Sequence, residues 1–136
     1  PIRMKQYCEN ATAVAKFLET SDKIVSVTYP GLETDQYHAL AQKYLPNGTC
    51  GVISFSIKGG RPAAVRFMDA LELASIEVHV ADIRTCVLHP ASATHRQLTE
   101  EQLVAAGIDG GLIRLSVGLE HVDDILADVK QALDRV

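Results

Sequence analysis

"GLIRLSVGLEHVDD", residues 111–124, contains the strand pattern that decides the fold class. The apolar side chains of Ile113, Leu115 and Val117 alternate with the polar side chains of Arg114 and Ser116. Alternation with a period of two residues predicts a strand that has one apolar face and one polar face. We therefore expect one face of this strand to pack on a core and the other to meet water or another domain.

Two further segments alternate in the same way, namely residues 23–31, "KIVSVTYPG", and residues 50–57, "CGVISFSI". The predicted apolar faces consist of Val25, Val27, Tyr29, Ile53, Phe55 and Ile57. A weaker strand signal, residues 76–89, is expected to be interrupted near Asp82. Helices and strands alternate along the chain as in α/β proteins, but strands with one polar face favour a sheet covered by helices on one side only. The predicted class is therefore α+β, with an antiparallel or mixed sheet.

Five helices are expected from apolar spacing and end signals. They cover residues 1–22, a segment from Thr34 or Asp35 to the turn at 46–48, a segment that begins near Pro62, residues 99–107, and residues 122–136. The helix near Pro62 should bury Ala64, Val65, Met68 and Leu71. Thr99 and Gln102 have the spacing of a capping box, and Gly107 should end that helix.

Composition limits the class of protein. The 136 residues fit one domain, and 13 Lys+Arg against 17 Asp+Glu give no basic surface typical of a nucleic-acid partner. No apolar run reaches the roughly 18 residues that a membrane span needs. The three cysteines, Cys8, Cys50 and Cys86, are far apart in the sequence and form no CxxC pair. We interpret them as reduced thiols of a cytoplasmic protein. The abrupt helical start at Pro1 favours a piece of a longer chain.

Arg114 is the leading candidate for a binding residue. Its planar guanidinium can hold a carboxylate through two hydrogen bonds, and Gly110, Gly111 and Gly118 nearby should leave room for a ligand or another chain. The alternative is a solvated strand arginine paired with a nearby acid.

Three other features carry weaker signals. "IKGGRPAA" places Lys58 and Arg61 beside a glycine turn, where an anion is conceivable but a plain turn is favoured. Cys86, His89 and His95 do not have the spacing of a zinc site, and no orienting acid for a hydrolase is evident, so we expect no metal and no catalytic residue in this chain. The hydroxyls and imidazoles around Pro90 should instead bond backbone groups. His79, between two valines, has the ordinary interpretation of a structural histidine.

Five ordered motifs, "VTYPGL", "ISFSIKGG", "ADIRTCVLHPASATHRQL", "AAGI" and "GLIRLSVGLEHVDDI", resemble the C-terminal domain of the Cys/Met-metabolism family of pyridoxal-phosphate enzymes. The likeness covers nearly the whole chain, and it is greatest to the sulfhydrylase branch, which makes homocysteine from O-acetylhomoserine and sulfide. Methionine γ-lyases, cystathionine γ-synthases and cystathionine β-lyases remain alternatives. The resemblance implies the small domain of an aspartate-aminotransferase-like enzyme, with a mostly antiparallel sheet and helices on one face.

The resemblance also implies roles for two residues. The arginine of the family's "RLSVG" motif, here Arg114, holds the α-carboxylate of the amino-acid substrate. The small polar residue that assists it is replaced by His79, and Ala81 stands where the family usually has glycine. His79 is therefore a second candidate for substrate binding, or it reshapes the mouth of the pocket.

The family's Schiff-base lysine and its cofactor-phosphate contacts belong to a preceding large domain that this chain lacks. Residues 1–136 would then form a single substrate-binding domain, inactive alone, within a cytoplasmic homotetramer that uses pyridoxal phosphate. A hypothesis from another class is a free-standing amino-acid-binding or interaction module with the same fold, whose partner surface is the polar face of the sheet.

Overall fold

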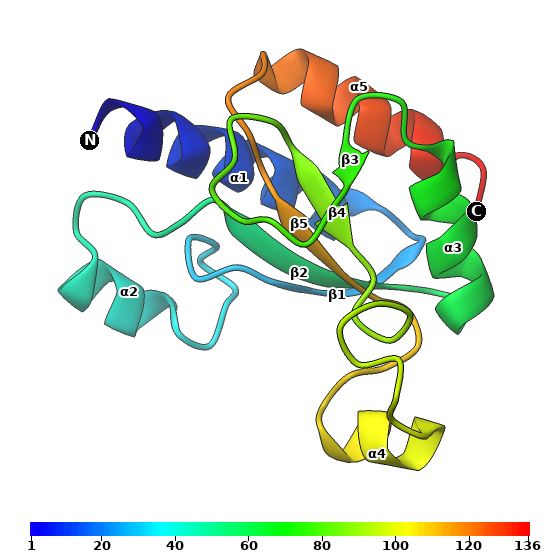
Figure 1. The fold of residues 1–136 in the computed structure, drawn as a ribbon. Helices are drawn as coiled ribbons and strands as arrows, with labels where there is room; N and C mark the ends of the chain where they lie inside the picture. The colour runs from blue at the N-terminus through cyan, green and yellow to red at the C-terminus, as the bar shows by residue number, and fades with distance from the viewer.

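The computed structural model describes residues 1–136 and is built on one five-stranded sheet with strand order β1-β2-β5-β4-β3 (Figure 1). The strands are β1 (Ile24–Thr28), β2 (Val52–Ile57), β3 (Ser75–Ile76), β4 (Cys86–Leu88) and β5 (Leu112–Ser116). Only the short edge pair β3 and β4 is parallel, and the other neighbours are antiparallel. The predicted α+β class with a mostly antiparallel sheet is confirmed.

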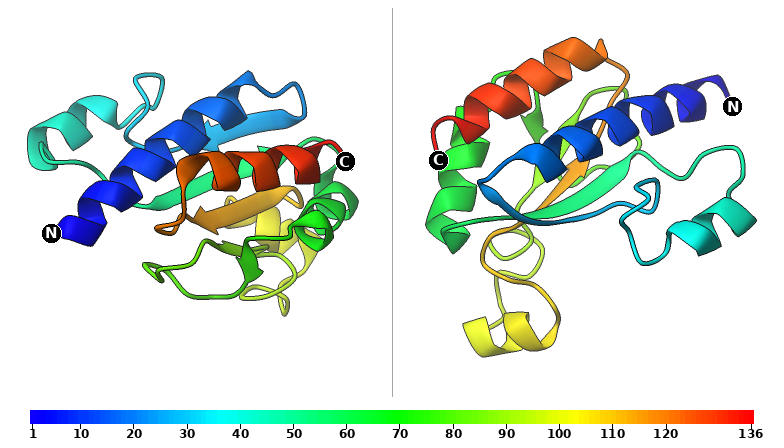
Figure 2. Two further views of the ribbon diagram at one scale, coloured as in Figure 1. Left: turned by 90° about the horizontal axis from the view of Figure 1, so that it is seen from above. Right: turned by 180° about the vertical axis from the view of Figure 1, so that it is seen from behind.

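Three helices cover one face of this sheet, as predicted (Figures 1 and 2). They are α1 (Ile2–Thr20), α3 (Gly60–Ala70) and α5 (Val122–Leu133), whereas the short α2 (His38–Tyr44) and α4 (Glu100–Ala105) project away from the sheet. The core between helices and sheet is a cluster of 23 buried residues, in which the rings of Phe55 and Phe67 meet edge to face at 5.8 Å. None of the helices combines the length and the hydropathy needed to span a bilayer.

The first strand departs from its predicted face. Val25 was expected in the core, but its exposed fraction is 64%, and Ile24 is buried instead. The pairing register with β2 shifts between Ile24 and Ser26, so Val25 occupies a β-bulge. A bulge inserts one unpaired residue and displaces the alternation, which is why the pattern assigned Val25 to the wrong side.

Helix α2 begins later than expected, at His38. The carboxylate of Asp35 accepts hydrogen bonds from the backbone N–H of Tyr29 at 2.9 Å and of Tyr37 at 2.8 Å, so it holds a turn before the helix. Asp and Asn commonly form such local side-chain to backbone bonds in turns. Val65 of α3 is 41% exposed and not in the core as predicted, because Ala63, Ala64, Phe67 and Met68 form the buried face of that helix.

The predicted strand over residues 76–89 is reduced to its two ends, β3 and β4. Residues 77–85 form an irregular loop, so the interruption expected near Asp82 is much wider than one residue.

The capping box predicted at the start of α4 is confirmed, since the Thr99 hydroxyl accepts from the Gln102 N–H and the Gln102 side chain accepts from the Thr99 N–H. Gly107 follows α4 with a φ of 73°.

Candidate functional site

Arg114 lies in β5 on the face of the sheet that the helices do not cover. Its pairing partners are Ser54 of β2 and Leu88 of β4. One terminal nitrogen of the guanidinium, Nη2, donates to the carbonyl oxygen of Val78 at 2.7 Å and approaches that of His79 at 3.4 Å. The loop 77–85 therefore fixes one side of the guanidinium from above the sheet.

The Nε–H of the same guanidinium has no hydrogen-bond partner. Arg114 Nε is the one buried side-chain nitrogen or oxygen in the chain without a hydrogen-bond partner. A buried donor left unpaired costs about 1–3 kcal/mol, and native proteins rarely tolerate one without a reason. Nε is buried, so a ligand cannot reach it in this structure, whereas Nη1 forms no hydrogen bond within the chain. Because a guanidinium presents its N–H donors in one plane, its terminal nitrogens could hold a carboxylate.

The glycines around β5 do not provide the expected room for a ligand. A Cβ on Gly111 would lie 2.4 Å from the Ile57 carbonyl oxygen, and one on Gly118 would lie 2.5 Å from backbone atoms of Arg84 and Thr85. A Cβ on Gly110 would meet the backbone of Arg61 at 3.2 Å. The close approach that these glycines permit is made by the protein's own backbone, so this part of the prediction was wrong.

The loop above Arg114 is fastened at Ala81. The Ala81 N–H donates to the Ser116 hydroxyl at 3.1 Å, and the Tyr7 hydroxyl lies 3.1 Å from the Ala81 carbonyl oxygen and 3.0 Å from that of Asp82. Ala81 is also the one residue other than glycine with a positive φ, 59°. Tyr7 and Ser116 were not predicted as parts of this site, although the replacement of a usual glycine by Ala81 indicates an unusual backbone at this position.

We expect Ala81→Gly to raise the free energy of unfolding by about 0.5–1 kcal/mol, because an L-residue in the left-handed region is strained and glycine is not. The control is Ala127→Gly on the exposed side of α5, which should lower the same quantity by about 1 kcal/mol. Urea unfolding followed by circular dichroism measures both. A destabilised Ala81→Gly variant would show that the loop does not store this strain.

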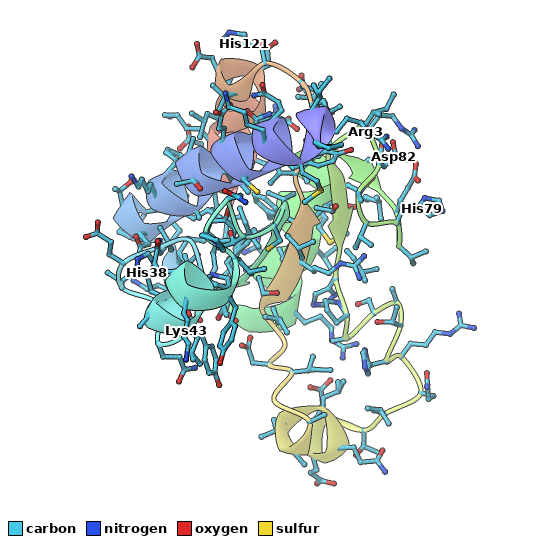
Figure 3. The ribbon with its side chains drawn as sticks, turned by 90° about the vertical axis from the view of Figure 1, so that its left-hand side faces the viewer. Arg3, His38, Lys43, His79, Asp82 and His121 are labelled. Carbon is cyan, nitrogen blue, oxygen red and sulfur yellow. The ribbon has the colours of Figure 1, made fainter.

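His79 reaches the site through its backbone and not through its ring. Its carbonyl oxygen faces Arg114, but the imidazole is 64% exposed and its Nδ1 lies 2.6 Å from the Glu77 carboxylate. Figure 3 shows this ring pointing outward from the loop. The expected strand position of His79 is also wrong, because the residue lies in the irregular segment between β3 and β4.

A second polar cluster lies on the same loop. The ligand atoms of Glu77, Asp82 and Cys86 lie within 4.8 Å of one another, but Arg84 already pairs with Glu77 at 3.0 Å and with Asp82 at 3.4 Å. Hydrogen bonds from the Arg84 backbone and guanidinium lower the pKa of Asp82, so its charged form stabilises the fold at neutral pH and that contribution is lost as pH falls through the lowered pKa. Burial raises the pKa of the Cys86 thiol, which disfavours the nucleophilic thiolate.

The two histidines that flank Pro90 serve the backbone and their own loop. His89 is buried, with Nε2 lying 2.9 Å from the Gly110 carbonyl oxygen and Nδ1 lying 2.8 Å from the Ser92 hydroxyl. His95 bonds the neighbouring Thr94 hydroxyl at 2.9 Å. The prediction that hydroxyls and imidazoles of this loop bond backbone groups around Pro90 was wrong, because the one backbone partner is the distant Gly110 and the other bonds join side chains. Cys86 clusters with carboxylates instead of with these rings.

The glycine turn after β2 is a plain turn, which is the interpretation that the sequence favours over an anion site. Gly59 and Gly60 have φ values of 94° and 63°. Lys58 donates to the Asp22 carbonyl oxygen, and Arg61 pairs with Glu100 at 2.8 Å. Lys58 and Arg61, the two cations that could bind an anion here, are thus already bonded to groups of the chain itself.

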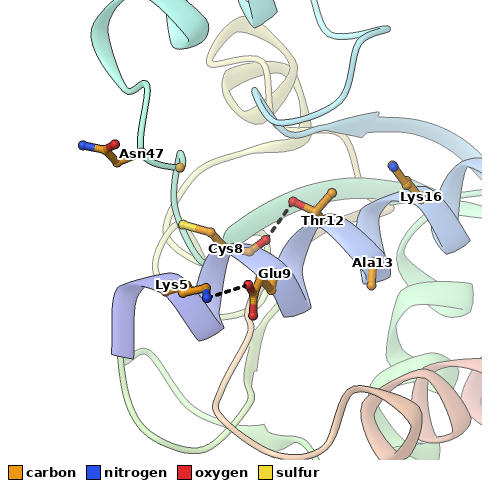
Figure 4. A pocket seen from close by; sticks show the side chains of 8 residues that line it. Lys5, Cys8, Glu9, Thr12, Ala13, Lys16 and Asn47 are labelled. Atoms are coloured by element: carbon orange, nitrogen blue, oxygen red, sulfur yellow. Dashed lines mark hydrogen bonds and ion pairs between the residues drawn. The ribbon is translucent and has the colours of Figure 1, made fainter. Parts of the chain in front are cut away.

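A surface groove of about 670 Å³ runs along α1 (Figure 4). Its walls include Lys5, Cys8, Glu9 and Asn47, and it shares no residue with Arg114 or the loop 77–85. Lys5 and Glu9 pair with each other at 3.8 Å. The groove is therefore separate from the residues predicted to bind the substrate.

Comparison with known proteins gives a consistent result. Residues 1–134 match the family described as Cys/Met metabolism PLP-dependent enzyme. The whole chain is 46% identical to an O-acetyl-L-homoserine sulfhydrylase of Leptospira meyeri, covering 31% of it. A homocysteine synthase of Schizosaccharomyces pombe is 48% identical over 98% of the chain and 31% of its own length. An L-methionine gamma-lyase of Fusobacterium nucleatum is 46% identical over 99% of the chain and 34% of its own length.

A solved structure is similar over the same extent. The crystal structure of a Campylobacter jejuni protein described as an O-acetylhomoserine (thiol)-lyase, with N'-pyridoxyl-lysine-5'-monophosphate, matches with a TM-score of 0.90 and 41% identity. The match covers 98% of this chain and 32% of that one. The chain thus spans about a third of the length of the relatives that it matches.

Proposed function

Because the chain belongs to the Cys/Met-metabolism family of pyridoxal-phosphate-dependent enzymes, we propose that it is the substrate-binding domain of an O-acetylhomoserine sulfhydrylase. The complete protein would convert O-acetylhomoserine and sulfide into homocysteine and acetate. Two of the relatives reported above, the sulfhydrylase and the homocysteine synthase, support this reaction. In this proposal the domain follows a larger cofactor-binding domain in the same polypeptide.

The observation that carries the proposal is the Arg114 guanidinium on the uncovered face of the sheet, where the loop holds Nη2 and Nη1 forms no hydrogen bond within the chain. We assign to Arg114 the α-carboxylate of the amino-acid substrate. Charge-assisted hydrogen bonds to a guanidinium are about twice as strong as neutral ones, and they fix direction as well as affinity. His79 contributes its carbonyl oxygen, which helps to orient the guanidinium, while its ring stays near the mouth of the site.

The residues of this chain do not fit the role of holding the cofactor. Schiff-base chemistry needs a lysine with a lowered pKa in a desolvated pocket. Lys23 instead donates to the carbonyl oxygens of Leu133 and Val136, both at 2.8 Å, and the other lysines are exposed. Pyridoxal phosphate acts as an electron sink for bond breaking in amino acids. The part that we assign to this chain is to bind the substrate and set its orientation.

The partners proposed for the domain are the amino-acid substrate, the preceding domain of its own polypeptide and further copies in a homotetramer of the cytoplasm. The polar face of the sheet, where Arg114 lies, is the surface that would meet the cofactor-binding domain. No nucleic acid and no membrane enter this proposal.

The test is an activity assay on the complete protein with pyridoxal phosphate, run in parallel with the 136-residue chain. We expect sulfide-dependent homocysteine formation from O-acetylhomoserine in the complete protein and none in the isolated chain. Activity of the isolated chain, or no reaction of the complete protein with any amino acid, would contradict the proposal.

Methionine γ-lyase is the second candidate, because a relative with that name is as similar as the sulfhydrylase, 46% in each case. The two candidates differ in their products. Release of an α-keto acid without sulfide would replace the sulfhydrylase assignment with the lyase assignment and leave the role of Arg114 unchanged.

A further inference from the structure

Building on the proposed role of Arg114, we infer that Tyr7 is a positioning residue for the substrate carboxylate. Tyr7 belongs to α1, and its side chain does not bond Arg114. It acts through the loop 77–85, whose carbonyl oxygens at Val78 and His79 hold the guanidinium.

The contact joins parts of the chain that are 74 and 75 residues apart. Tyr7 is only 3% exposed, so its hydroxyl has little access to water and depends on the two carbonyl oxygens of Ala81 and Asp82. A hydroxyl has one proton, which the two acceptors share. Removal of this oxygen would leave both carbonyl groups without the bond that fixes the loop to α1.

Hydrogen bonds hold the two ends of the loop, since the Glu77 N–H donates to the Val87 carbonyl oxygen at 3.0 Å and the Leu119 N–H donates to that of Ile83 at 2.8 Å. Val78, Val80 and Ile83 are each more than half exposed, so they add little packing. An apolar cavity of about 150 Å³ lies beneath it, lined in part by Met4, Tyr7, Val80 and Ser116. Between these ends, the polar bonds at Ala81, from Tyr7 on one side and to Ser116 on the other, fix the middle of the loop.

The same bonds keep Ala81 in the left-handed region that an alanine rarely adopts. When the bond to Tyr7 is lost, the strained backbone can relax, and the carbonyl oxygens of Val78 and His79 three and two residues earlier can move with it. Arg114 then loses its fixed direction while keeping its charge. We therefore expect a protein without this bond to discriminate less strongly between ligands with and without a carboxylate, and to keep its fold.

The experiment titrates the complete protein, loaded with pyridoxal phosphate, with glycine and with methylamine, and follows the absorbance of the cofactor. These two amines differ by the carboxylate, so the ratio of their dissociation constants reports carboxylate recognition alone. Tyr7→Phe should reduce the preference for glycine about 3- to 10-fold, as loss of one hydrogen bond predicts, with methylamine binding unchanged. Ser116→Ala removes the other bond to Ala81 and should reduce the preference in the same direction.

Tyr29→Phe is the matched control. Tyr29 is also fully buried, and its hydroxyl donates to the Cys50 carbonyl oxygen at 3.0 Å, but it does not contact the loop. This variant should keep the wild-type preference. If Tyr7→Phe and Ser116→Ala keep it too, or weaken glycine and methylamine equally, the inference is wrong. Arg114→Ala should abolish the preference, and if it does not, the proposed function fails and the inference with it.

Discussion

Replacement of Arg114 by alanine in the complete protein is expected to lower kcat/KM for O-acetylhomoserine by about 30- to 4,000-fold, which corresponds to about 2–5 kcal/mol. The loss arises because the substrate carboxylate would enter a desolvated site without its charged partner. It should appear in KM, and in kcat as well where the bond also orients the reacting carbon atoms. Initial rates of homocysteine formation over a range of O-acetylhomoserine concentrations measure both constants.

Two further variants separate charge from geometry. Arg114→Lys keeps the positive charge but loses the planar pair of donors, so it should recover only part of the activity. Arg66→Ala removes an arginine from the exposed side of α3 and should leave the kinetics unchanged. Wild-type kinetics for Arg114→Ala would return Arg114 to the alternative interpretation of an ordinary strand arginine.

The sheet and its one-sided cover were predictable because the period-two pattern depends only on local sequence. Ile53, Phe55, Ile113 and Leu115 are all buried as the alternation requires. The pattern failed at Val25, since a bulge changes the register and depends on how two strands meet. A sequence pattern contains no information on that pairing.

The candidate site was predictable only in part. The position of Arg114 on the polar face follows from alternation, whereas its hydrogen bonds depend on which carbonyl oxygens the loop 77–85 brings to Nη2. β-branched residues in that loop favoured a strand, but contacts from Tyr7 and Ser116 hold it in an irregular path. Long-range hydrogen bonds of this kind override local propensity.

Asp128 occupies a position whose importance no sequence pattern indicated. It lies in α5, is 7% exposed, and accepts hydrogen bonds from three successive backbone N–H groups, those of Glu72, Leu73 and Ala74, at 2.8, 3.0 and 2.9 Å. The Gln131 side chain donates to it as well, at 3.0 Å. This carboxylate therefore fixes the turn that connects α3 to β3 and, beyond β3, to the loop above Arg114.

Asp128→Ala is expected to lower the free energy of unfolding by about 3–5 kcal/mol, because three backbone donors lose their buried acceptor at once. Asp128→Asn keeps one carbonyl oxygen and should lose about half as much. Asp124→Ala, exposed on the first turn of the same helix, should cost less than about 1 kcal/mol. Urea unfolding of the three variants distinguishes these values. A loss at Asp128 no greater than that at Asp124 would mean that water satisfies the turn, and the turn would then not depend on α5 for its shape.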